Sequence, residues 1–166
     1  MVGKSIFSIV NQTHHMRAIC LTALSVFILF GCADQRQPDS GPKINHTAIY
    51  VVDLESSATF YKDIIGLDTI PEPFHDGRHA WFSLGKGVAL HIIQGAEEKK
   101  GYYKNQHTCL SVPSLDPVIE KLRKNNIAWE DRDGAPMTVT TRVDGVKQLW
   151  IKDPDGYWIE INDAKE

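Results

Sequence analysis

Apolar and polar residues alternate most clearly near the end of the chain, in residues 157–162. Successive side chains of a strand point to opposite faces, so Trp158, Glu160 and Asn162 share one face. The Asp-Pro-Asp-Gly sequence at 153–156 predicts a tight turn before this strand, because proline presets φ and glycine accepts a positive φ. Glu160 is therefore a carboxylate in an otherwise apolar and aromatic strand. An edge strand with a solvated glutamate is the simple alternative.

The hydrophobic pattern between residues 44 and 163 occurs twice. Residues 44–94 open with Asn-His-Thr followed by an apolar strand, and residues 106–163 open with Gln-His-Thr followed by a second one. Each strand continues into an amphipathic helix, with Asp53 or Ser114 as the expected N-cap. The two copies are joined by a polar linker, residues 95–105, which we expect to be a solvated loop.

Three strand candidates follow each predicted helix, so each copy has the order βαβββ. The fold class is therefore α+β, with the two modules forming a cupped, mixed eight-stranded sheet and the helices on its outer face. The candidates are residues 67–70, 80–84 and 88–93 in the first copy and residues 128–130, 148–152 and 157–162 in the second, with a further strand at 139–142 before an Asp-Gly hairpin signal.

Four polar residues interrupt apolar strands at positions that the repeat makes equivalent: His46, His91, His107 and Glu160. Taken singly, each histidine is also explained as a hydrogen-bonded structural residue. Together they supply imidazole and carboxylate donors that suit a divalent ion such as Zn²⁺, Ni²⁺, Co²⁺, Mn²⁺ or Fe²⁺. Such an ion would also remove the cost of burying an unpaired carboxylate.

The N-terminal region differs from the repeat. Residues 18–30 are almost all apolar, a run too short for the ~20 residues of a membrane span but typical of a secretory signal. Residues 29–32 resemble a bacterial lipobox ending at Cys32, although Phe30 is larger than usual. We therefore predict a signal peptide at 1–32, lipidation of Cys32 and a flexible tether at 33–43.

This N-terminal pattern predicts an exported lipoprotein that faces the periplasm, with the outer membrane favoured because Ala33 follows Cys32. A plain cleaved signal and an N-terminal membrane anchor are the alternatives. Met16 would also serve as a start and would give a shorter signal peptide.

The net charge and the cysteine positions limit the classes of function and of chemistry that we expect. The 166 residues carry a net charge of −3, which argues against a nucleic-acid partner. With Cys20 in the signal and Cys32 as the lipid site, Cys109 is the one cysteine left for the folded domain, so no intrachain disulfide is expected there. A lone cysteine is more often a small buried hydrophobe than a nucleophile, and we expect Cys109 to be dispensable for chemistry.

The paired βαβββ units, the strand-opening histidines and the ending Asp153-Pro154-x-Gly156-x-x-x-Glu160 resemble the vicinal oxygen chelate superfamily. That group includes glyoxalase I, fosfomycin-resistance thiol transferases, methylmalonyl-CoA epimerase and extradiol dioxygenases. The resemblance covers about residues 44–162 and implies the same cupped fold. It also places the family's four metal ligands on the four residues above, although glyoxalase I usually has glutamate where this chain has His91.

The resemblance implies a metal-dependent lyase or isomerase of glyoxalase type, which chelates two neighbouring oxygens of a small substrate. Glu160 would then be both a metal ligand and the catalytic base. Trp81 and Trp158 are candidate pocket walls, with core aromatics as the alternative. Arg78 and Arg142 could hold an anionic substrate group, with exposed loop arginines as the alternative.

Other members of the superfamily leave other functions open. These are a thiol transferase, an extradiol dioxygenase, and a non-catalytic module that binds a small ligand or metal, as bleomycin-binding relatives do. His46, His107 and Glu160 match the two-histidine, one-carboxylate set of iron dioxygenases, but His91 would fill a position that those enzymes leave open. The eleven-residue linker permits a cup within one chain or a cup exchanged between the chains of a homodimer.

Overall fold

The computed structural model describes residues 41–165. The predicted signal peptide, Cys32 and most of the predicted tether lie outside the described residues. Within the described part of the chain, no helix is long and apolar enough to cross a bilayer.

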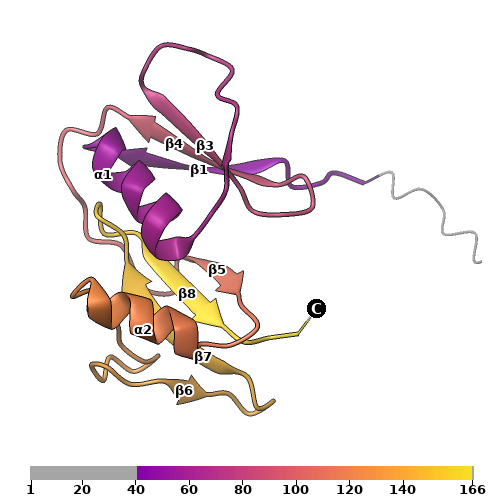
Figure 1. Cartoon of the computed structure of the whole chain (residues 1–166), viewed down its shortest axis with the longest axis vertical. Coiled ribbons are helices and arrows are strands. Elements are labelled where there is room, and N and C mark those ends of the chain that lie inside the picture. Colours follow the sequence, from indigo (N-terminus) through magenta and orange to yellow (C-terminus); the bar gives the residue numbers. More distant parts are fainter. Residues whose placement is uncertain (1–40, 166) are drawn as a thin grey trace, which may run out of the picture. The chain divides into compact units, whose positions relative to one another are not determined.

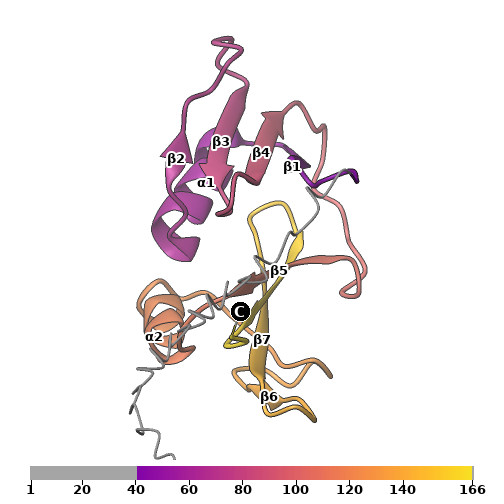
Figure 2. The ribbon, with the colours of Figure 1, turned by 90° about the vertical axis from the view of Figure 1, so that its right-hand side faces the viewer.

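The first module contains one helical segment and a four-stranded sheet with the order β1-β4-β3-β2 (Figures 1 and 2). Strand β1 runs parallel to β4, and the other neighbouring strands are antiparallel. The elements are β1 His46–Val51, α1 Leu54–Thr59, η1 Phe60–Ile65, β2 Thr69–Ile70, β3 His79–Ser83 and β4 Ala89–Gln94.

The helical segment of this module begins where the sequence predicts. Asp53 caps α1 by accepting a hydrogen bond from the backbone N–H of Ser56 at 3.0 Å. Gly66 ends the segment at a φ of +89°. Its last part, η1, is a π-helix in which the N–H of Gly66 donates to the carbonyl of Tyr61 at 3.1 Å. This widened turn was not predicted.

The second module repeats this arrangement, with the sheet order β5-β8-β7-β6 and β5 parallel to β8. The segment 128–130 forms no strand. It contributes isolated bridges from Glu130 to Pro136 and to Trp150. The elements are β5 His107–Ser111, α2 Asp116–Lys124, β6 Thr140–Thr141, β7 Lys147–Lys152 and β8 Trp158–Asn162.

The α+β class and the two βαβββ modules are thus confirmed. The eight strands are divided between two four-stranded sheets instead of one continuous sheet, because β1 and β5 each pair on one side and form sheet edges. The two modules also match in strand register. Trp81 lies opposite His91 in the first sheet, and Trp150 lies opposite Glu160 in the second.

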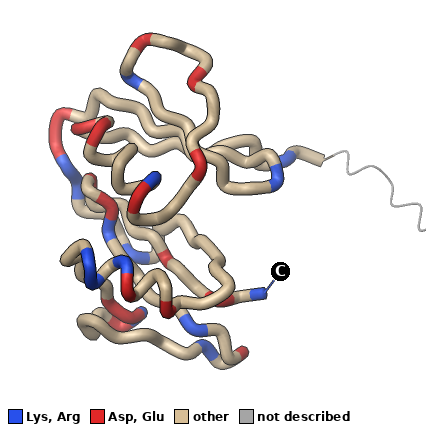
Figure 3. The backbone as a smooth tube through the Cα atoms, viewed as in Figure 1, with Lys and Arg blue, Asp and Glu red and all other residues tan. Residues whose placement is uncertain are grey.

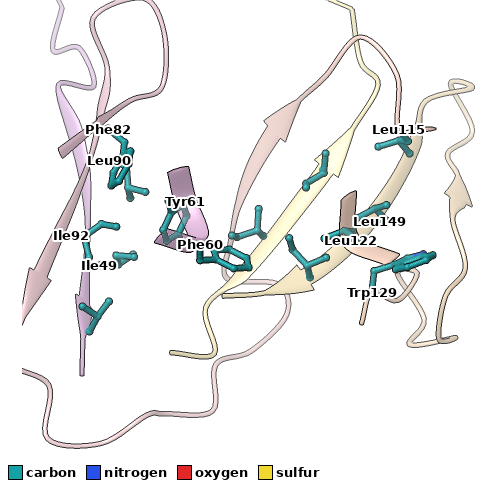
Figure 4. Packing of buried hydrophobic residues seen from close by; sticks show 14 residues of the cluster. Ile49, Phe60, Tyr61, Phe82, Leu90, Ile92, Leu115, Leu122, Trp129 and Leu149 are labelled. Carbon is teal, nitrogen blue, oxygen red and sulfur yellow. The ribbon is translucent and has the colours of Figure 1, made fainter. Parts of the chain in front are cut away.

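Buried apolar residues of both modules belong to one cluster (Figure 4). Phe60 and Tyr61 of η1 are part of it, together with residues of both sheets. Strand β8 is buried along its whole length. The hydrophobic core is therefore formed by the apolar face of each sheet. The four polar residues that interrupt the apolar strands are not part of this core.

The predicted turn before β8 joins the two modules. Its Asp153 accepts a hydrogen bond from the hydroxyl of Tyr61 at 2.9 Å, and Asp155 accepts one from the hydroxyl of Ser57 at 3.0 Å. Burial raises the pKa of Asp153, and burial together with Asp153 raises the pKa of Tyr61. Donors from the first module thus stabilise the turn that positions Glu160.

The linker packs on this turn and is not a freely solvated loop throughout. Gly156 has a φ of +93°, and a Cβ there would lie 2.7 Å from the carbonyl oxygen of Lys100. The indole N–H of Trp158 donates to the carbonyl of Tyr102 at 3.0 Å. Figure 3 shows acidic and basic residues interspersed along the described chain.

Candidate functional site

The first pair of candidate ligands, His46 and His91, lies on adjacent strands of the first sheet, with ring centroids 5.9 Å apart. We call this pair the first half-site. Nδ1 of His46 lies 2.8 Å from the side-chain oxygen of Asn45. A hydrogen bond there places the ring proton on Nδ1 and leaves Nε2 with the lone pair that binds a metal.

His91 is held within a stack of aromatic rings. Trp81 lies 4.0 Å from it at an interplanar angle of 17°, and Phe74 lies 5.8 Å from it at 15°. Its side chain is buried, and burial, followed by the neighbouring His79 and His46, lowers the pKa of His91. The imidazole is therefore neutral at pH 7, which is the form that binds metals.

The second pair, His107 and Glu160, forms what we call the second half-site. Nε2 of His107 lies 3.1 Å from Oε2 of Glu160. The other carboxylate oxygen, Oε1, accepts a hydrogen bond from Nδ2 of Asn162 at 2.9 Å. Glu160 is 7% exposed, so both of its oxygens have partners in a buried setting.

The two nitrogens of His107 both face acceptors. Nδ1 lies 2.9 Å from the carbonyl oxygen of Lys104, while Nε2 faces the carboxylate of Glu160. A neutral imidazole has one N–H, so it can satisfy one of these two oxygens. The second needs a further proton on the ring or a cation between Nε2 and the carboxylate. The donor set of this half-site therefore fits a divalent ion.

The structure does not bring all four candidate ligands together in one chain. Within residues 41–165, no three histidine, cysteine, aspartate or glutamate side chains are arranged to hold an ion. The first sheet carries one pair and the second sheet carries the other. The four-ligand centre stays a prediction, and a single chain provides its two halves separately.

The predicted pocket residues have different surroundings. Trp81 lies on His91, as described. The ring of Trp158 is covered by the ammonium groups of Lys104 and Lys152, at 5.0 and 4.4 Å. Both arginines have partners away from the half-sites: Arg78 donates to the carbonyl of Gln94 at 3.1 Å, and Arg142 forms an ion pair with Asp144 at 2.6 Å. A role for these residues in substrate binding remains a prediction.

Sequence reasoning missed three residues that the structure places around the half-sites. Trp150 is the repeat equivalent of Trp81, and Asn162 orients Glu160. His79 contacts His91 directly, at 2.6 Å between Nδ1 and Nε2. For Asn162, the available signal was its place two residues after Glu160, on the same face of β8. Cys109, expected to be buried, is exposed and lies beside Glu160 in register, because β5 is an edge strand.

Comparisons with known proteins agree with this architecture. Lactoylglutathione lyase of Pseudomonas putida is 27% identical over 152 residues, covering 70% of this chain and 82% of the lyase. The mitochondrial methylmalonyl-CoA epimerase of Mus musculus is 26% identical over 122 residues, covering 64% of this chain and 68% of the epimerase. The solved structure of the oxidase ChaP-H1 has a TM-score of 0.62 at 26% identity, covering 75% of this chain and 98% of the oxidase.

The family profile described as Glyoxalase/Bleomycin resistance protein/Dioxygenase superfamily matches residues 43–161, which include both half-sites and both modules except the end of β8. The chain therefore belongs to the glyoxalase/bleomycin resistance protein/dioxygenase superfamily.

Proposed function

We propose that this protein is a divalent-metal-dependent enzyme of the glyoxalase type, acting on a small substrate with two neighbouring oxygens. The observation that carries the proposal is the environment of His107, whose Nδ1 faces a carbonyl at 2.9 Å while its Nε2 faces Glu160 at 3.1 Å. When bound, a divalent ion would supply Lewis-acid stabilisation of negative charge on the substrate oxygens.

Glu160 has the features of a catalytic base. Asn162 holds Oε1 at 2.9 Å, which fixes the carboxylate plane and leaves Oε2 to accept a proton. The same carboxylate is 7% exposed, so bulk water does not compete strongly for that oxygen. Proton abstraction from a carbon next to a carbonyl group is the reaction class that this arrangement supports, in keeping with the lyase and epimerase among its relatives.

A second copy of the chain completes the site in this proposal. Strands β1 and β5 are both sheet edges, and both present exposed residues, among them His46, Tyr50 and Cys109. An exposed edge is a surface on which another chain can pack. In a two-fold symmetric dimer, the first half-site of each chain would meet the second half-site of its partner and give two identical centres.

The test measures metal content by mass spectrometry after reconstitution with Zn²⁺, Ni²⁺, Co²⁺, Mn²⁺ or Fe²⁺. We expect close to one ion per chain in the wild type. The double variant His107→Ala, Glu160→Gln should fold and bind almost none, because the second half-site loses both donors. A matched double variant at exposed positions, His75→Ala with Glu120→Gln, should retain the wild-type content.

The metal-loaded protein is then assayed for glyoxalase, thiol-transferase, epimerase and dioxygenase turnover. Metal content near zero in the wild type, or unchanged content in the double variant, would refute the metal centre. Stoichiometric metal with ligand-dependent thermal stabilisation but no turnover would replace the enzyme by the alternative, a binding module.

A further inference from the structure

A hollow of about 280 Å³ lies where the linker meets the end of β1 and the start of β8. Three tyrosines line it: Tyr50 of β1, Tyr102 of the linker and Tyr157 just before β8. The four candidate metal ligands are not among the described residues that line it. The hollow is therefore a separate feature from the two half-sites.

Two of the three aromatic walls are held in place by other parts of the chain. The hydroxyl of Tyr157 donates to the backbone carbonyl of Tyr50 and accepts the backbone N–H of the same residue, each at 3.2 Å. The ring of Tyr157 stacks on Tyr102, with centroids 4.1 Å apart and an interplanar angle of 21°. The carbonyl of Tyr102 accepts the indole N–H of Trp158 at 3.0 Å. These walls are preorganised, so a ligand that binds here orders few side chains.

The third wall, Tyr50, lies against the linker at Gly95. A Cβ on Gly95 would overlap the hydroxyl group of Tyr50, and the φ of Gly95 is +142°, which residues with a side chain rarely adopt. Glycine at this position therefore lets the ring of Tyr50 close one side of the hollow, although the residue is 48% exposed.

The charged residues of the lining are mainly acidic. Glu97 and Glu98 line the hollow together with one basic residue, Lys100. Neither glutamate forms an ion pair with another of residues 41–165. The two carboxylates are therefore available to balance the charge of a cation in the hollow.

Two further carboxylates add negative charge behind Tyr102. Burial, followed by the hydrogen bond with Tyr157, raises the pKa of Tyr102. The negative charges of Asp153 and Asp155 raise that pKa further, so their field reaches this wall of the hollow. Aromatic faces attract cations, and quaternary ammonium groups are the ligands that clusters of such faces most often bind.

We propose that this hollow binds a small organic cation with a methylated ammonium group, packed against the three tyrosines, with Glu97 and Glu98 as its counter-charges. Pockets for drug-sized ligands measure about 300–1,000 Å³, so a hollow of about 280 Å³ suits a trimethylammonium group on a short chain.

The test uses three probes of nearly equal shape and different charge: choline, the uncharged 3,3-dimethylbutan-1-ol and the anionic 3,3-dimethylbutanoate. Binding is followed by nuclear magnetic resonance of protein labelled with ¹³C in its tyrosine rings, at constant ionic strength. Choline should shift the ring signals of Tyr50, Tyr102 and Tyr157 but not that of Tyr103. It should bind at least about threefold more tightly than the alcohol, and the carboxylate should bind most weakly.

Variants of the lining identify what holds the cation. Tyr50→Ala should lower the affinity for choline by at least about threefold, whereas Tyr50→Phe keeps the ring and should change it little. Replacing both Glu97 and Glu98 with glutamine should also weaken binding. Lys100→Gln should strengthen it, because it removes a like charge. Tyr103→Ala is the matched control on the same linker, since Tyr103 is 82% exposed and should change nothing.

Several results would overturn the proposal. Unshifted tyrosine signals with choline, equal affinity for choline and the alcohol, or weaker binding after Lys100→Gln would each show that the hollow does not select a cation. Circular dichroism confirms that each variant is folded before its affinity is interpreted. These outcomes do not depend on bound metal, because the candidate metal ligands do not line the hollow.

Discussion

Cys109 lies beside Glu160 in register, at the position that Ala48 occupies beside His91 in the first module. Although the residue is exposed, its sulfur accepts a hydrogen bond from Nδ2 of Asn162 at 3.1 Å. Burial of the sulfur, followed by the negative charge of Glu160, raises the pKa of the Cys109 thiol to about 12. An exposed cysteine with so high a pKa has very little thiolate near neutral pH.

Cys109 in the metal-free protein should therefore react slowly with iodoacetamide at pH 8, at least about tenfold more slowly than the thiol of an unstructured peptide with a pKa near 8.5. Glu160→Gln removes the charge that raises the pKa and should speed up alkylation. Cys109→Ser should leave metal content and any turnover within a few-fold of wild type. The rates are followed by mass spectrometry. Alkylation as fast as in the peptide would contradict this account and restore Cys109 as a candidate nucleophile.

At the same scale, the sequence identifies residues by type and periodicity but not by contact. His46, His91 and His107 stand out because each interrupts an apolar strand in register with the repeat. His79 does not, because it begins its strand beside polar loop residues, where a histidine is unremarkable. Its closeness to His91 arises from the pairing of β3 with β4, and pairing register is a tertiary property.

At the scale of elements, the turn formed by residues 153–157 is predicted by the sequence and positions Glu160 in the site. Asp153 accepts the backbone N–H groups of Asp155 and Tyr157 at 3.0 and 2.8 Å, which closes the turn that starts β8. Its other oxygen accepts the hydroxyl of Tyr61 from η1. The aspartates thus act both within the turn and between the modules, which the turn pattern in the sequence does not indicate.

Tyr61→Phe should lower the free energy of unfolding by roughly 1.5–3 kcal/mol, because it removes a hydrogen bond to a buried carboxylate and leaves Asp153 with one donor fewer. Tyr103→Phe is the matched control, since Tyr103 is 82% exposed and should change stability by less than about 0.5 kcal/mol. Urea denaturation followed by circular dichroism measures both. Equal stability of the two variants would show that the contact between Tyr61 and Asp153 contributes little.

The elements themselves follow from local pattern wherever the pattern is strong. The alternation in β8 and the cap at Asp53 predict their elements closely, because period and capping are local properties. The widened turn of η1 and the loss of a strand at 128–130 were not predictable. Both depend on packing: η1 places Tyr61 against Asp153, and the 128–130 segment contributes single bridges to neighbours instead of a ladder.

At the scale of the whole molecule, the sequence predicts two equivalent modules but not how they combine. The local hydrophobic pattern predicts which face of each strand is buried. It does not predict which strand edges pair with each other. The eleven-residue linker permits several arrangements, and the structure adds that its residues near Gly156 pack on the second module. Both first strands are sheet edges, and within residues 41–165 the two half-sites do not combine into one ion site.

Sites shared between two chains should be restored by mixing variants that lack opposite halves. His91→Ala breaks the first half-site, and the double variant His107→Ala, Glu160→Gln breaks the second, so each protein alone should bind almost no metal. In a mixed dimer, the intact first half-site of one chain meets the intact second half-site of the other and gives one complete centre. Random pairing after co-refolding makes half of the dimers mixed, so metal content should rise to about a quarter of the wild-type value.

Mixing His46→Ala with His91→Ala is the matched control, because both variants break the same half and should restore nothing. If each centre instead forms within one chain, no mixture recovers metal, and the four ligands must then come together by a rearrangement of the two modules.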